Sequence, residues 1–110
     1  MKQLKCACLD GLDATSVDVE ATFTKGLPSF SIVGLASSSI QESKDRVKSA
    51  LLTNEFKFPP LKITINLSPS DLAKSGTHFD LPIALLLALQ NEKSVKFDDF
   101  FVFGELGLAL

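Results

Sequence analysis

The sequence predicts an α+β domain in which a mostly antiparallel or mixed sheet is packed by two main helices. Several short stretches alternate apolar with polar residues, which indicates strands with one buried face. Residues 39–54 carry apolar side chains at helical spacing, and residues 81–89 contain no polar side chain. Because a helix that is apolar on every side must be buried, we expect the second helix at the centre of the core.

The composition bounds both the size and the partners of the domain. With 110 residues, 45% hydrophobic and 22% charged, the chain is expected to form one globular domain with its own core. A net charge of −2 and a pI near 5.3 exclude a global positive field. Any contact with nucleic acid therefore needs a local basic patch.

The two cysteines favour a reduced protein in the cytoplasm. Cys6 and Cys8 lie two residues apart, so on a strand they share one face, where a bridge between them would be strained. We expect small buried apolar side chains rather than a disulfide or a soft-metal site. The first residues lead into no hydrophobic stretch of signal length, so neither export nor a membrane partner is expected.

The first third of the chain predicts three strands. Residues 4–9, 17–24 and 30–33 carry the apolar residues, and residues 25–28 supply turn chemistry between the last two. Sequential strands joined by short connections favour an antiparallel meander.

A surface helix is predicted at residues 39–54. Ser39 and Glu42 have the spacing of a capping box, and Glu42 and Arg46 are placed for an ion pair on the exposed side. The link that follows contains Phe56 and Phe58, which we expect to cover the core rather than to bind a peptide.

Residues 62–90 form the unit around which the rest is organised. Residues 62–67 alternate as a strand, and Pro69 ends it because proline cannot donate to a ladder. Asp80 is expected to cap the apolar helix 81–89, which is shorter than the roughly 20 residues needed to cross a bilayer.

A further strand is predicted at residues 97–103, which are rich in phenylalanine. The apolar segment 106–110 after it is unusual for a finished protein. We therefore expect a fragment, residues 1–110, of a longer polypeptide.

The polar loop before the apolar helix holds the candidates for chemistry. They are Ser68, Ser70, Asp71, Lys74, Ser75, Thr77, His78 and Asp80. A hydrolase needs a nucleophile, a base and an orienting group, but no Gly-x-Ser-x-Gly elbow is present, and we favour a solvated loop. Two aspartates make a poor cation site, and no phosphate-binding Gly-x-x-x-x-Gly-Lys-[Ser/Thr] motif occurs. No catalytic, cofactor-binding or metal-binding residue is predicted.

Contact with DNA or with a partner protein would have to use a small set of basic residues. The candidates are Lys44, Arg46, Lys48, Lys62, Lys74 and His78. Glu42 and Asp45 dilute the field on the helix, so a solvated helix face is favoured over a DNA patch.

Four ordered blocks carry a resemblance to a known family. They are GLPSFSIVGL at 26–35, QESKDRV at 41–47, INLSPSDL at 65–72 and FDLPIAL at 79–85. The chain resembles the N-terminal domain of the ComM/YifB group, which are bacterial magnesium-chelatase-like AAA+ ATPases. This resemblance covers nearly the whole chain and implies a Lon-like fold of the ribosomal protein S5 domain 2 type, similar to the Lon-like domain of RadA.

The resemblance also implies what the parent protein does. It implies an AAA+ module outside this chain that binds ATP and magnesium and forms a homo-oligomeric, hexameric ring. Members of the ComM type are DNA helicases that promote branch migration during recombination and natural transformation. The domain is then expected to be a non-proteolytic accessory domain that aids ring assembly or DNA engagement.

Comparison with Lon peptidases implies that proteolysis is absent. In these enzymes the nucleophilic serine follows a glycine by two residues, and counting from Gly76 that position is His78. The base lysine of Lon would come from beyond Leu110. Two alternatives stay open: a protein-binding module that uses residues 97–103 without DNA contact, and a relic hydrolase of the Lon type.

Overall fold

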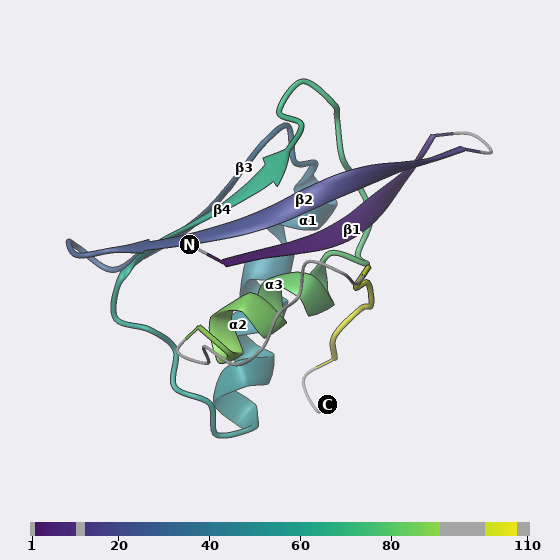
Figure 1. Cartoon of the computed structure of the whole chain (residues 1–110). Helices are drawn as coiled ribbons and strands as arrows, with labels where there is room; N and C mark the ends of the chain where they lie inside the picture. Colours follow the sequence, from purple (N-terminus) through teal and green to yellow (C-terminus); the bar gives the residue numbers. More distant parts are fainter. Residues whose placement is uncertain (1, 11–12, 91–100, 108–110) are drawn as a thin grey trace.

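The computed structural model describes residues 2–10, 13–90 and 101–107. In chain order the elements are β1 (Lys2–Asp10), β2 (Asp13–Thr24), β3 (Ser29–Val33), α1 (Ser38–Gln41), α2 (Ser43–Thr53), β4 (Lys62–Ser68) and α3 (Asp80–Ala88). The strands form one four-stranded mixed sheet, and the helices lie together on one of its faces (Figure 1). The α+β class and the mixed sheet packed by two main helices are therefore confirmed.

Alternation in the sequence places the sheet's apolar residues on the helical side. In β4, Ile63, Ile65 and Leu67 are fully buried, whereas the residues between them are partly exposed. In β1, Cys6 and Cys8 are buried and free, as predicted. Burial raises the pKa of the Cys6 thiol to about 11, which keeps it protonated and unreactive at neutral pH.

The strand order corrects the expected meander. The sheet runs β1-β2-β4-β3, so β4 lies between β2 and β3. β4 is antiparallel to β2 but parallel to β3, with Ile32 opposite Ile65. A parallel pair needs a long crossover, and here α1 and α2 supply it. The alternation of residues defines a strand and its faces, but not its neighbour, and for this reason the prediction was wrong.

The predicted helix over residues 39–54 is divided at Glu42 into α1 and α2. No side chain caps α1, and the predicted capping box between Ser39 and Glu42 does not form. The Ser39 hydroxyl instead lies 2.7 Å from the Ser37 hydroxyl and accepts a hydrogen bond from the Gly76 N–H at 3.0 Å. A capping side chain bonds backbone N–H groups of its own helix, whereas Ser39 connects α1 to the loop that contains Gly76.

The apolar helix lies in the core, as predicted. Ile83, Leu86 and Leu87 on α3 are at most 1% exposed. α3 contacts β1, β2 and α2, so it is covered by the sheet on one side and by a helix on another (Figure 1). Among the described residues, no helix combines the length and the apolar character that a membrane crossing requires.

The segment 101–107 contacts the edge of the sheet that β1 forms. Phe101 forms an isolated parallel bridge with Lys5, and the Val102 N–H donates to the Lys5 carbonyl at 2.8 Å. The first part of the strand predicted at 97–103 lies outside the described residues. Phe101 and Phe103 are 55% and 58% exposed, while Leu106 is buried in the core.

The burial of α3 predicts that its side chains contribute strongly to the free energy of unfolding. Leu86→Ala removes a fully buried side chain and leaves a cavity, so the free energy of unfolding should fall by about 2–5 kcal/mol. Leu27→Ala is the matched control, since Leu27 is 89% exposed, and it should change the free energy by less than about 0.5 kcal/mol. Urea denaturation measures both. Equal effects of the two substitutions would contradict this placement of α3.

Candidate functional site

The loop between β4 and α3 is fastened to the segment that follows β3. The Lys74 N–H donates to the Leu35 carbonyl, and the Ser37 N–H donates to the Lys74 carbonyl, each at 3.0 Å. Lys74 and Ala36 thereby form a short parallel bridge. Gly34 begins this segment at a φ of 110°, with the Leu67 carbonyl so close that a Cβ could not fit. The loop is thus held by backbone bonds to a segment about forty residues away along the chain.

The side chain of Lys74 lies inside this corner. It is 1% exposed, and its Nζ donates to the Gly34 carbonyl at 2.7 Å and to the Pro69 carbonyl. Burial lowers the pKa of Lys74, and the charge of Asp71 partly opposes this shift. The expectation of a solvated loop is wrong at this residue, because the amine bridges the ends of β3 and β4.

Two further residues of the loop are also engaged. The Nε2 of His78 lies 2.7 Å from the Ala7 carbonyl of β1, and its ring is stacked at a tilt on Phe79 with 4.5 Å between centroids. The Thr77 hydroxyl donates to the Glu105 carboxylate at 2.6 Å. These contacts join the loop to β1 and to the segment 101–107.

Asp80 is a buried ion-pair partner rather than the predicted helix cap. It is fully buried in the first turn of α3, and Phe79 occupies the cap position. The Arg46 guanidinium donates to the Asp80 carboxylate twice, from Nε to Oδ2 at 2.7 Å and from Nη2 to Oδ1 at 3.0 Å. The Leu106 N–H also donates to Oδ2, at 3.3 Å. The prediction was wrong because a fully buried carboxylate is stable only when hydrogen-bonded donors compensate its charge, and Arg46 of α2 supplies them.

Arg46 is correspondingly turned inwards. Its predicted contact with Glu42 exists at 3.9 Å, but the contact with Asp80 is shorter and bidentate. The hydrogen bond with Asp80 raises the pKa of Arg46 further above its ordinary value. The pair therefore joins α2 to α3, and Arg46 also donates to the Ser39 carbonyl at 3.2 Å.

The remaining candidates for chemistry do not converge. Ser70, Asp71 and Ser75 are exposed. Within residues 2–10, 13–90 and 101–107, no serine hydroxyl hydrogen-bonds the Lys74 amine, whose recorded partners are backbone carbonyls. The same residues contain no cluster of three or more His, Cys, Asp or Glu side chains that could hold a metal ion. The arrangement holds the loop in place, and it also brings in Cys8 of β1, whose Sγ donates to the Ala73 carbonyl at 3.9 Å and interacts electrostatically with Lys74.

The six basic candidates are not gathered into one patch. Lys74 is buried, Arg46 is paired with Asp80, and His78 is partly buried against β1. Lys48 and Lys62 are exposed, and Lys44 is half-buried on α2. The cationic surface available to a partner is thus smaller than the sequence predicts.

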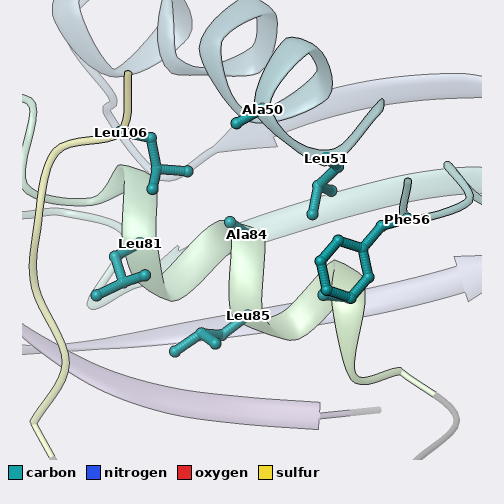
Figure 2. Close-up of a pocket in the computed structure, with 8 residues that line it drawn as sticks. Ala50, Leu51, Phe56, Leu81, Ala84, Leu85 and Leu106 are labelled. Atoms are coloured by element: carbon teal, nitrogen blue, oxygen red, sulfur yellow. The ribbon is translucent and has the colours of Figure 1, made fainter. Parts of the chain in front are cut away.

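An apolar groove lies between α2 and α3. It is lined by Ala50 and Leu51 of α2, by Leu81, Ala84, Leu85 and Ala88 of α3, and by Phe56 and Leu106 (Figure 2). Its volume of about 110 Å³ is well below the ~300–1,000 Å³ of small-molecule sites. With no polar group in its lining, the groove has no means of orienting a cofactor.

Sequence reasoning missed the structural roles of Lys74, Arg46 and Asp80. One signal for the pair was present: Asp80 directly precedes an uninterrupted apolar helix, where a charge has to find a partner. Lys74 offered no comparable signal, since a lysine in a polar loop is usually solvated.

Comparison with known proteins gives a consistent result. The profile of the family described as "Subunit ChlI of Mg-chelatase" matches residues 19–109. The chain is 42% identical over 101 residues to YifB of Escherichia coli, covering 90% of this chain and 20% of that protein. It is 47% identical over 75 residues to "Competence protein ComM" of Haemophilus influenzae, covering 68% of this chain and 15% of ComM. It is also 37% identical over 100 residues to the protein Rv2897c of Mycobacterium tuberculosis, covering 89% and 20%. The chain therefore spans about a fifth or less of the length of these relatives.

The Arg46–Asp80 ion pair predicts a large loss of stability when one partner is neutralised. Asp80→Asn keeps the shape of the side chain but leaves Arg46 without its counter-ion, so the free energy of unfolding should fall by about 2–4 kcal/mol. Glu42→Gln removes only the long, exposed contact and should cost less than about 0.5 kcal/mol. Urea denaturation compares them, and a Glu42→Gln effect as large as that of Asp80→Asn would rule out this assignment.

Lys74 predicts a pH-dependent difference in stability. Lys74→Met removes the donor that joins the Gly34 and Pro69 carbonyls and should lower the free energy of unfolding by about 2 kcal/mol at neutral pH, whereas the exposed Lys57→Met should be near neutral.

The lowered pKa of Lys74 sets the direction of that dependence. Between the lowered pKa and the ordinary value of 10.5, the unfolded chain binds more protons at this residue than the folded chain. The stability of the wild type relative to Lys74→Met should therefore rise as the pH approaches 10.5. Urea titrations at several alkaline pH values measure it, and a falling difference would contradict the burial of a charged amine.

Proposed function

We propose a function from one premise: this chain belongs to the family of subunit ChlI of Mg-chelatase. The proposed function is that of a non-proteolytic accessory domain of a magnesium-chelatase-like AAA+ ATPase. The observation that carries the proposal is the family match over residues 19–109, together with relatives at 42–47% identity. The chain spans about 20% of YifB, so we propose that the ATP- and magnesium-binding module lies elsewhere in the longer protein.

The structure favours a scaffold role for the domain within that ATPase. The polar corner uses Lys74, His78 and Asp80 to hold its own backbone and helices, and its serines Ser70 and Ser75 are exposed. We propose a Lon-like, S5 domain 2-like arrangement that has become a rigid support for assembly of a hexameric ring. The mixed sheet covered by helices on one face supports this view of the fold.

The finer proposal is a role in DNA recombination in the cytoplasm. ComM of Haemophilus influenzae is named a competence protein, and this name supports a role of the longer protein in competence for natural transformation. Branch migration of DNA is the activity that we propose for that role. Of the six basic candidates, Lys44, Lys48 and Lys62 remain available for DNA. With so few cations the binding should be weak and sensitive to salt.

The DNA proposal predicts that DNA affinity falls when the charges of two lysines on α2 are reversed. Lys44→Glu combined with Lys48→Glu should weaken binding to a fluorescent branched DNA at low salt, because both lysines lie on α2 and would neutralise phosphates. The slope of log affinity against log salt should shrink by about 2. Fluorescence anisotropy measures both quantities.

The matched control for this experiment is Lys25→Glu combined with Lys57→Glu, two exposed lysines outside α2. Binding that is equally weakened in the control would show a general charge effect. Unchanged binding in the α2 variant would reject the patch.

A further inference from the structure

β3 leaves one edge of the sheet open. The sheet order β1-β2-β4-β3 gives β3 a partner on one side only (Figure 1). The Ser29 N–H donates to the Leu61 carbonyl at 3.3 Å, so the backbone groups of Ser29, Ser31 and Val33 face β4. In a parallel ladder the residues between them, Phe30 and Ile32, turn their backbone groups outwards.

The outward groups of β3 are largely unengaged. The Gln41 side chain donates to the Ile32 carbonyl at 3.0 Å. In the part of the chain that the structure describes, no recorded hydrogen bond from another segment reaches the Ile32 N–H or either backbone group of Phe30. Two donors and one acceptor are therefore available to an additional strand.

The opposite edge of the sheet differs in this respect. There Phe101 forms an isolated parallel bridge with Lys5, and the Val102 N–H donates to the Lys5 carbonyl. Natural proteins protect open edges with charges, prolines or bulges. β3 has none of these in its sequence Ser-Phe-Ser-Ile-Val, which makes it a template for pairing.

A hollow beside the start of β3 adds side-chain recognition. Phe30, Leu52, Phe58 and Pro60 line it, and the rings of Phe30 and Phe58 lie 5.6 Å apart. Its volume of about 360 Å³ has room for apolar side chains of a peptide. Lys48 is the one charged residue in this lining, with its Nζ 5.3 Å from the centroid of the Phe58 ring. The hollow thus combines an apolar floor with a cation and contains no carboxylate.

We propose that β3 and this hollow form a binding site for an extended, acidic peptide segment of a partner protein. The peptide adds as a strand to the backbone of Phe30 and Ile32 and places an apolar side chain on Phe30 and Phe58. One of its carboxylates pairs with the Lys48 ammonium, which completes the charge complementarity. A second copy of this chain fits less well, because β3 carries no acidic residue to offer to Lys48.

The test uses the full chain and a fluorescein-labelled synthetic peptide of alternating valine and aspartate. Fluorescence anisotropy should show binding that Lys48→Glu weakens by about tenfold or more. A peptide with lysine in place of aspartate should show the reverse preference and bind the Lys48→Glu variant better. N-methylation of alternate residues of the acidic peptide should abolish binding, since it removes the donors that a strand requires.

The matched controls separate this site from a general attraction to cations. Lys57→Glu and Lys44→Glu should leave peptide binding unchanged, because neither residue lines the hollow. Peptide addition should shift the amide NMR signals of Phe30 and Ile32.

Three results would overturn the proposal. They are the absence of peptide binding, equal losses in the Lys48→Glu and Lys57→Glu variants, and a concentration-dependent dimer that shifts the Phe30 and Ile32 amides without peptide. The last result would assign the β3 edge to a second copy of the chain.

Discussion

The buried carboxylate of Asp80 is the constraint on which the arrangement of the helices depends. A charge without solvent is tolerated only if hydrogen-bond donors surround it, and here Arg46 from α2 and the Leu106 backbone from the C-terminal segment supply them. Three segments distant in sequence must therefore meet at one point. The relative position of α2 and α3, and the apolar groove between them, follow from this meeting (Figure 2).

A second buried charge organises the opposite end of the loop. The Lys74 amine crosses from the carbonyl of Gly34 to that of Pro69, so it holds together the ends of the two parallel strands β3 and β4. Both contacts use backbone carbonyls as acceptors, so the lysine serves as a structural donor that joins the loop to the segment after β3.

The sequence predicted what is local and missed what is distant. Alternation over 62–67 and the apolar run at 81–89 identified a strand and a core helix, since each pattern is set by burial of one element. The parallel pairing of β3, the partner of Asp80 and the burial of Lys74 depend on residues more than thirty positions away. For Arg46, a contact four residues away was visible in the sequence, but a stronger one 34 residues away decided its position.

The two edges of the sheet divide the molecule into a closed and an open side. On the β1 side, Phe101 bridges to Lys5 and the segment continues to Leu106 in the core, so that edge is joined at this point to the Asp80 cluster. On the β3 side the backbone groups of Phe30 make no hydrogen bond within the described residues, and the exposed Leu52 lines the hollow beside Phe30. The Arg46–Asp80 pair joins α2 to α3, whereas the Lys74 amine binds the Gly34 carbonyl directly after β3, so a partner on this edge would lie next to one of the two buried charges. The bidentate contact of Arg46 with Asp80 and the contacts of Lys74 thus hold the fold of the domain itself.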